Sequence, residues 1–225
     1  MIDIHTHILP KMDDGSDSVE TSTKMLKELK DQGVKLVYLT SHFYPRNEEI
    51  DDFLKRRNEA YHLLNNLNLD IELKLGAEVH YYRGISASEN IGKLCLEDTN
   101  LLLLELPFSY PINDFVLKDL INLNYRYRVI LAHIERYDLN DKIIRYLKDN
   151  DILLQSNCEY LIDKKTCKKA LKYYKHNLID FMGSDCHNLE DRAPNYKQAS
   201  DILKNKINEE FYFNLVDKTH IILDV

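Results

Sequence analysis

The sequence has no long apolar segment. The stretch Leu101–Phe108 (LLLLELPF) is the longest candidate, and it contains Glu105 and falls short of the ~18 residues that cross a bilayer. The first residues also lack the basic segment and apolar core of a secretory signal. We therefore expect no membrane insertion and a cytoplasmic location.

Positive charge and cysteine are also in short supply. The chain has 30 Lys and Arg residues against 37 Asp and Glu, so the net charge is −7 and the pI is about 5.7. Nucleic-acid binding needs a clustered basic surface, and we expect no such partner. The 4 cysteines have no paired spacing, which indicates reduced thiols. The absence of tryptophan and the scarcity of glycine and proline are interpreted as compositional drift.

Strand-length apolar runs alternate with helical patterns along the whole chain, with no linker or repeat. Strands that are apolar on both faces and separated by helices indicate a parallel sheet covered by helices. The pattern predicts a single α/β domain over residues 1–225, closed into a barrel. The expected strands are Met1–His7, Lys35–Thr40, Ile71–Glu78, Leu101–Leu106, Val129–His133, Ile152–Ser156 and Leu178–Gly183. The expected helices are Val19–Gln32, Glu49–Leu67, Asp114–Leu123, Asp141–Asn150, Lys164–His176 and Asn195–Lys206.

The first predicted strand carries two histidines in the motif MIDIHTH. Side chains two apart on a strand point to the same face, so His5 and His7 project together, with Asp3 beside them. Further imidazoles and carboxylates stand where other strands end, and in a barrel these ends meet on one face, where active sites lie. The convergent residues are His5, His7, His42, Glu78, Glu105, His133, Asp185 and His187.

So many imidazoles and carboxylates would repel or stay unsatisfied without cations between them. Mixed nitrogen and oxygen ligands suit Mn²⁺, Fe or Zn²⁺, with Mg²⁺ a further candidate, and their number indicates more than one ion. The segment KMDDGSD has two interpretations. Asp13 and Asp14 could form only an Asp-Gly turn, or Asp14 could be an additional ligand.

Two arginines complete the predicted site, namely Arg136 in HIERYD and Arg192 in SDCHNLEDR. Guanidinium groups match phosphate geometry, so both are expected to bind a substrate phosphate and to act in catalysis. Either could instead pair with Asp138 or Asp191. His80 is expected to border the substrate if the strand continues beyond position 78. The other histidines are expected at the solvated surface: His62, His176 and His220.

The motifs occur in order along essentially the whole chain: MIDIHTH, DDG at 13–15, TSH at 40–42, GAE at 76–78, Glu105, AHIERYD at 132–138 and GSDCHN at 183–188. They resemble the polymerase-and-histidinol-phosphatase (PHP) superfamily and, within it, the CpsB/CapC/YwqE type of bacterial tyrosine-protein phosphatase. The resemblance implies a distorted (β/α)7 barrel with up to three ions, Mn²⁺ being favoured. The ligands that it implies are His5, His7, Asp14, His42, Glu78, Glu105, His133, Asp185 and His187, with Arg136 and Arg192 near the phosphate.

The resemblance also implies a substrate, the phosphotyrosine tail of a bacterial tyrosine autokinase that controls capsular or exopolysaccharide synthesis. A histidinol-phosphate phosphatase of the same superfamily would share every ligand and differ only in its pocket. Two other assignments fit less well. An amidohydrolase usually needs a lysine at a strand end, and no lysine here ends a strand in that way. A TatD-like nuclease is poorly compatible with the net negative charge of the chain. A non-catalytic metal-binding regulator of a kinase would have no need of the complete ligand set. The acidic surface and the 15 tyrosines are compatible with a homo-oligomer.

One motif points toward a different chemistry. Cys186 and Arg192 have the C-x5-R spacing of cysteine-dependent tyrosine phosphatases. The intervening loop has no glycine to curl around a phosphate, and its Glu190 and Asp191 should raise the pKa of the thiol. We therefore expect Cys186 to point away from the metals into the barrel wall, and we expect catalysis to depend on metal.

Overall fold

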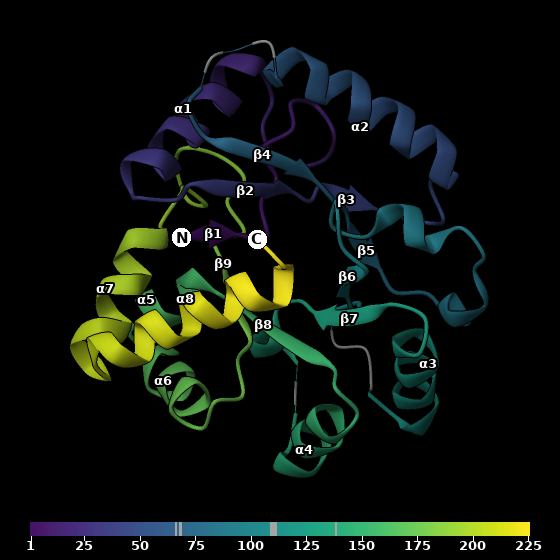
Figure 1. The fold of residues 1–225 in the computed structure, drawn as a ribbon. Coiled ribbons are helices and arrows are strands. Elements are labelled where there is room, and N and C mark those ends of the chain that lie inside the picture. The colour runs from purple at the N-terminus through teal and green to yellow at the C-terminus, as the bar shows by residue number, and fades with distance from the viewer. Residues whose placement is uncertain (66, 68, 109–111, 138) are drawn as a thin grey trace.

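The protein is described by a computed structural model that places residues 1–65, 67, 69–108, 112–137 and 139–225. Parallel strands surround a common interior, and helices cover its outside (Figure 1). The strands are β1 (Ile2–Asp3), β2 (Leu36–Leu39), β3 (His42–Phe43), β4 (Glu72–Leu75), β5 (Glu78–His80), β6 (Leu101–Glu105), β7 (Arg128–Leu131), β8 (Leu153–Asn157) and β9 (Phe181–Gly183). The α-helices are α1 (Val19–Asp31), α2 (Ile50–Asn65), α3 (Asp114–Asn124), α4 (Asp141–Asp149), α5 (Cys158–Ile162), α6 (Cys167–Lys175), α7 (Tyr196–Lys206) and α8 (Glu209–Leu223). Short 3₁₀ turns are η1 (Ile85–Ala87), η2 (Ile91–Leu94) and η3 (Ile134–Arg136).

The strands close into a barrel with seven positions. One sheet has the order β1-β2-β4 and the other has the order β3-β5-β6-β7-β8-β9, with parallel pairing throughout. β2 leads into β3 and β4 into β5 after two residues, so the two sheets are continuous. The circle closes where Thr6 bridges Cys186 and the His7 N–H donates to the Cys186 carbonyl at 3.0 Å. The predicted distorted (β/α)7 barrel is confirmed.

The predicted strand over residues 71–78 is broken at Gly76 into β4 and β5. The Gly76 carbonyl accepts a hydrogen bond from the Arg57 guanidinium at 2.9 Å, so a side chain takes the place of a neighbouring strand. A Cβ at this position would lie 2.7 Å from the Leu96 side chain, which explains why a glycine stands here. The first strand is likewise shorter than predicted, because regular pairing ends at Asp3.

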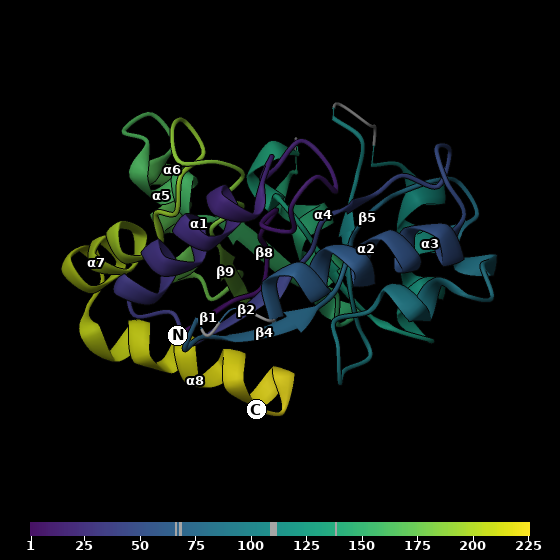
Figure 2. The same cartoon turned by 90° about the horizontal axis from the view of Figure 1, so that it is seen from above.

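Two helices were not predicted, the short α5 and the C-terminal α8, and α6 begins later than expected. α8 packs against α7 and β1, and its last residue, Leu223, joins the apolar cluster inside the barrel. Figure 2 shows α8 along the side of the molecule where the chain begins. This helix therefore covers the amino end of the barrel. None of the helices in the described ranges is long and apolar enough to cross a membrane.

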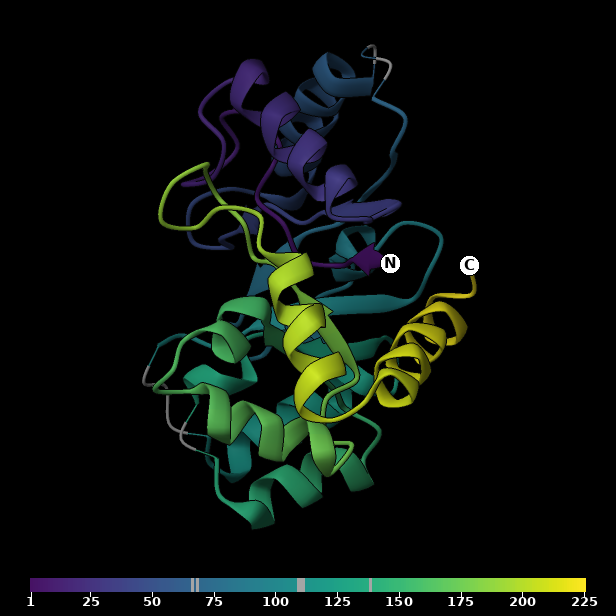
Figure 3. The ribbon, with the colours of Figure 1, turned by 90° about the vertical axis from the view of Figure 1, so that its left-hand side faces the viewer.

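The core has two layers, because alternate residues of each strand face opposite ways. Leu102 and Leu104 of β6 face the surrounding helices, whereas Leu101 and Leu103 face the interior. In Figure 3 the N-terminal strand lies in the middle of the molecule, between α1 and α2 on one side and the helices of the second half on the other. The buried residues of the interior cluster are Ile2, Ile4, Leu36, Tyr38, Leu96, Leu101, Leu103, Ile130, Ala132, Leu153, Phe181 and Leu223.

Candidate metal centre

The two histidines of MIDIHTH lie side by side at the carboxyl end of the barrel. Ile4 belongs to the interior apolar cluster, yet the adjacent His5 also faces inward, so the strand alternation is broken between them. The Nε2 atoms of His5 and His7 are 3.3 Å apart, and both side chains are fully buried. Asp3 does not join them. Its carboxylate accepts hydrogen bonds from the backbone N–H groups of His5 and Ser184.

Glu78 lies at the centre of the cluster and is fully buried. Its Oε2 is 2.9 Å from His42 Nδ1, 3.2 Å from His5 Nε2 and 3.3 Å from His7 Nε2. Its Oε1 is 2.6 Å from His133 Nε2. Burial alone would raise the pKa of Glu78, but the charges of His5 and His133 outweigh this effect and hold the pKa well below its usual value. The carboxylate is therefore ionised and ready to bind cations.

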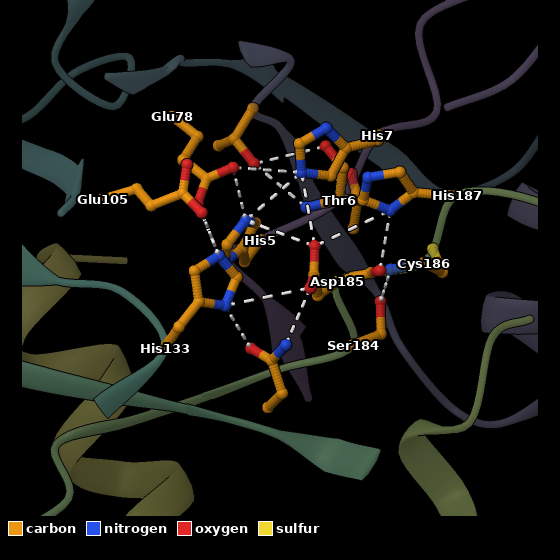
Figure 4. A network of polar contacts seen from close by, with 12 residues as sticks. His5, Thr6, His7, Glu78, Glu105, His133, Ser184, Asp185, Cys186 and His187 are labelled. Carbon is orange, nitrogen blue, oxygen red and sulfur yellow. Dashed lines mark hydrogen bonds and ion pairs between the residues drawn. The ribbon is translucent and has the colours of Figure 1, made fainter. Parts of the chain in front are cut away.

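Asp185 and His133 approach the same centre from the ends of β9 and β7, the two strands on either side of β8 (Figure 4). Asp185 Oδ1 is 3.3 Å from His7 Nε2 and 3.5 Å from His5 Nε2. Both Asp185 and His133 have left-handed backbone angles, with φ of 53° and 54°. Such angles are uncommon outside glycine and concentrate at functional sites, where they turn a side chain in a direction that a regular strand would not allow.

The rim of the cluster is formed by residues from other loops and strands. His42 Nε2 and His187 Nε2 lie 3.7 Å and 3.5 Å from Asp14 Oδ1. The neighbouring His187 imidazole lowers the pKa of Asp14 to about 2. Glu105 Oε2 is 3.9 Å from His42 Nδ1. The DDG segment therefore contributes a carboxylate to the site in addition to making a turn.

These residues form four overlapping groups whose potential ligand atoms lie within 4.8 Å of one another. The groups are His5, His7 and Asp185; His5, Glu78 and His133; His42, Glu78 and Glu105; and His7, Asp14, His42 and His187. Four of their atoms are buried and make no hydrogen bond within the described part of the chain: His42 Nδ1, Glu78 Oε2, Asp185 Oδ1 and His187 Nε2. Buried polar atoms without hydrogen bonds are costly, and coordination of cations would satisfy them. The nitrogen and oxygen donors are of the kinds that bind divalent ions, and the four groups together contain all nine residues predicted as ligands.

The two predicted phosphate-binding arginines lie against this centre. Arg136 is 3.1 Å from Glu105 Oε1 and 3.1 Å from Asp185 Oδ2, and Arg192 is 2.8 Å from the same Asp185 oxygen. Asp191 is not the partner of Arg192, since its carboxylate accepts from the Asn188 amide. The alternative partner of Arg136 at position 138 lies outside the described residues. His80 belongs to none of the four groups, although its Nδ1 is 3.3 Å from Glu105 Oε2.

Cys186 is fully buried in the outer core, and Figure 4 shows its sulfur pointing away from the cluster. Burial, together with the charge of Asp3, raises the pKa of its thiol well above the usual value. The C-x5-R spacing therefore does not create a reactive cysteine. His62 and His176 are exposed as expected, and His220 is half-buried.

Asp13, for which the sequence predicts only a turn, contacts two of the proposed ligands. Its Oδ2 lies 2.8 Å from His7 Nδ1 and accepts the His42 N–H at 2.7 Å. Gly15 allows this turn to pack against the strand, because a Cβ there would lie 2.1 Å from the His7 carbonyl oxygen. A carboxylate that holds the distal nitrogen of a ligand histidine fixes the ring and raises its basicity.

Gln155 and Asn157 of β8 form a second supporting layer that sequence reasoning missed. Gln155 Oε1 lies 3.3 Å from His5 Nδ1 and accepts the His133 N–H at 3.1 Å. Asn157 places its Oδ1 3.1 Å from His133 Nδ1 and donates its amide to Asp185 Oδ2 at 2.7 Å. The signal was present in LLQSN, where polar residues two apart interrupt a buried strand.

The comparisons with known proteins agree with this site. A family model described as "Capsular polysaccharide synthesis, CpsB/CapC" matches residues 1–221. The tyrosine-protein phosphatase CpsB of Streptococcus pneumoniae is 34% identical over 229 residues, which cover 92% of this chain and 90% of that protein. The tyrosine-protein phosphatase YwqE of Bacillus subtilis is 27% identical over 237 residues, covering 99% and 91%.

Solved structures show the same fold. A structure from work on the metal-dependent tyrosine phosphatases YwqE of B. subtilis and CpsB of S. pneumoniae superimposes with a TM-score of 0.85 at 24% identity, covering 100% of this chain and 94% of that chain. A Listeria monocytogenes structure provisionally assigned as a histidinol phosphatase has a TM-score of 0.55 at 17% identity, covering 88% and 99%. The family resemblance of the sequence motifs is thus confirmed. The chain belongs to the CpsB/CapC family of capsular polysaccharide synthesis proteins.

Proposed function

We propose that this protein is a metal-dependent tyrosine-protein phosphatase, built as a single PHP-type domain over residues 1–225. Its substrate is the phosphotyrosine tail of a bacterial tyrosine autokinase that controls capsular or exopolysaccharide synthesis, and it acts in the cytoplasm. The observation that carries the proposal is the convergence of nine potential ligands and two arginines at one end of the barrel. The names of the related CpsB, YwqE and CapC proteins support it.

The nine proposed ligands are His5, His7, Asp14, His42, Glu78, Glu105, His133, Asp185 and His187, and they would hold up to three ions, with Mn²⁺ preferred over Fe, Zn²⁺ or Mg²⁺. The bound cations would supply Lewis acidity and an activated water for in-line attack on phosphorus. Glu78 contacts four imidazoles, so this one carboxylate ties the ligand groups together.

Arg136 and Arg192 would bind and stabilise the transferred phosphoryl group. Both guanidinium groups donate to Asp185 Oδ2 from different segments of the chain. Their N–H donors therefore lie together at the edge of the ligand cluster. Such donors match the equatorial oxygens of a phosphate, whose negative charge must be neutralised during transfer. His80 stands beyond Glu105 on the open side, where it would border the substrate.

The proposal is tested by a paired substrate assay on the full chain loaded with Mn²⁺. We expect rapid phosphate release from a phosphotyrosyl peptide and little release from histidinol phosphate. Chelation should abolish the activity and Mn²⁺ should restore it. A strong preference for histidinol phosphate would instead identify the protein as a histidinol-phosphate phosphatase of the same superfamily. Failure to hydrolyse even p-nitrophenyl phosphate with metal bound would indicate a non-catalytic regulator.

A further inference from the structure

A pocket of about 360 Å³ adjoins the metal centre. It lies between the loop that follows β3, which carries Tyr44 and Arg46, and the residues from His80 to Arg83, with Pro107 beside them. Its apolar and aromatic lining with a few polar groups is typical of a ligand pocket. The volume is within the range of pockets that bind small molecules or single side chains.

Two residues that line the pocket, Tyr44 and His80, lie next to proposed ligands. The Tyr44 ring lies 5.0 Å from the His42 ring and 5.3 Å from the His80 ring, measured between centroids. His80 in turn is 3.3 Å from Glu105. A substrate whose phosphate lies on the metal centre would therefore extend over Tyr44 and His80 into this pocket.

The wall that carries Arg83 is held in place by a buried carboxylate from a neighbouring helix. Asp119 of α3 accepts hydrogen bonds from the Tyr81 hydroxyl at 3.0 Å and from the Gly84 N–H at 2.9 Å. The Ser86 hydroxyl also donates to Asp119. Gly84 has a φ of 85°, a left-handed angle that glycine adopts without strain. Hydrogen bonds to one buried carboxylate thus hold this wall in place.

The charge of the pocket is opposite to that of the molecule. The chain as a whole has a net charge of −7, but the described residues that line the pocket include Arg46 and Arg83 and no carboxylate. Within the described ranges, neither guanidinium has a carboxylate partner, and Arg83 instead lies 4.3 Å from the Phe115 ring centroid. The same two arginines also line a neighbouring pocket that contains Glu48 and Glu49. Glu48 is bound to Arg56, and within the described residues neither carboxylate forms an ion pair with Arg46 or Arg83. Two guanidinium groups that form no ion pair within the described residues, beside an aromatic lining, fit an anionic ligand.

We propose that this pocket is the peptide subsite of the enzyme, in which Arg46 and Arg83 select an acidic residue next to the phosphotyrosine. The inference rests on the proposed function, because it takes the phosphate to lie on the metal centre. It names a substrate class, phosphotyrosyl peptides with acidic flanking residues. A small phosphate ester fills only the metal end of the site and does not reach the two arginines.

The test compares peptides that differ only beside the phosphotyrosine, with Glu, Gln or Lys on both sides. The full chain loaded with Mn²⁺ is used, and kcat/KM is measured from phosphate release. We expect the Glu peptide to exceed the Gln peptide by about three- to tenfold, the combined effect of two partly exposed ion pairs. The preference should appear mainly in KM and should shrink as salt is added.

The variant Arg46→Gln/Arg83→Gln should bring the ratio of Glu to Gln peptide close to one. Arg128→Gln is the matched control, because Arg128 is exposed at the start of β7, the opposite end of the strand from the site, and this variant should keep the wild-type ratio. Arg46→Glu/Arg83→Glu should prefer the Lys peptide. A new preference of this kind does not arise from misfolding.

Equal rates for the Glu and Gln peptides in the wild type would overturn the subsite, as would a preference that survives in the double variant. Either result leaves the phosphatase itself intact. Failure to hydrolyse any phosphotyrosyl peptide, with histidinol phosphate consumed instead, would overturn the proposed function. The two failures are therefore distinguishable in one set of assays.

Discussion

The two ends of the barrel interior are built on the same strands and filled with opposite kinds of side chain. At the amino end, residues such as Leu101, Leu103 and Phe181 form a buried apolar cluster that α8 covers. At the carboxyl end, the same strands continue into Glu105 and Asp185 and their histidine neighbours. The change occurs within about two residues along β6, from Leu103 to Glu105.

The contrast shows that one end of the barrel supplies stability and the other end holds the groups proposed to carry the chemistry. Apolar burial stabilises the amino end without help from a ligand. The carboxyl end gathers buried imidazoles and carboxylates, whose desolvation opposes folding until cations bind between them. The apolar amino end can therefore hold the imidazoles and carboxylates of the carboxyl end close together, an arrangement that these polar side chains would not adopt on their own. Five predictions test this division, beginning with the largest expected effect.

Removing a proposed ligand at the carboxyl end should abolish activity and lower metal content without unfolding the barrel. His5→Ala and His7→Ala should each abolish most phosphatase activity and lower the metal content, because both side chains are buried in the ligand groups. Metal analysis, activity and circular dichroism measure the three quantities. His176→Ala, at an exposed position directly after α6, is the control. A variant at position 5 or 7 with full metal and normal turnover would refute the assignment.

Removing an apolar side chain should have the converse result. Leu103→Ala should lower the free energy of unfolding by about 2–5 kcal/mol, because it leaves a cavity in the interior cluster. Denaturant unfolding of the metal-free chain measures this change. Metal stoichiometry and turnover per folded molecule should stay at the wild-type level. Loss of metal in the folded variant would show that the two ends are not independent.

Arg136→Ala should leave metal stoichiometry unchanged and reduce kcat/KM by roughly 10²-fold, the loss of a charge-assisted contact to the substrate phosphate. Steady-state kinetics on p-nitrophenyl phosphate and metal analysis check both parts. If the variant loses metal instead, Arg136 supports Glu105 and Asp185 structurally. Unchanged kinetics would remove it from the site.

Asp13→Ala should weaken Mn²⁺ binding by about 10- to 100-fold, because His7 and the His42 backbone lose the carboxylate that orients them. Titration of the metal-free protein with Mn²⁺ measures the change, and excess Mn²⁺ should recover most of the activity. The control is Asp17→Ala, since Asp17 is an exposed carboxylate in the same loop. Equal metal affinity in both variants would deny Asp13 this supporting role.

Cys186→Ser is expected to have the smallest effect. The side chain lies in the outer core and its sulfur points away from the ligand cluster, so most activity should be retained. Thiol alkylation should inhibit weakly, whereas a strong chelator should silence the enzyme until Mn²⁺ is added. A serine variant that is inactive but fully metallated, beside a wild type indifferent to chelators, would overturn the metal mechanism.

The sequence by itself determined which side chains meet at the polar end. His5, His42, Glu105 and Asp185 all stand at or just beyond the ends of strands, and parallel strands in a barrel bring these ends to one face. Strand and helix periodicity are local properties, so the alternation that builds a seven-stranded barrel is visible in neighbouring residues. The proximity of the predicted ligands could be inferred from the chain for this reason.

The tertiary structure decided how those side chains are held. Gln155 reaches His5 across 150 positions of the chain, and Asp13 faces His42 because a turn folds back against the first strand. The left-handed backbone at His133 and the closure of the amino end by α8 likewise depend on packing between distant segments. No local pattern encodes such contacts, because their free energy arises only when the whole barrel has formed.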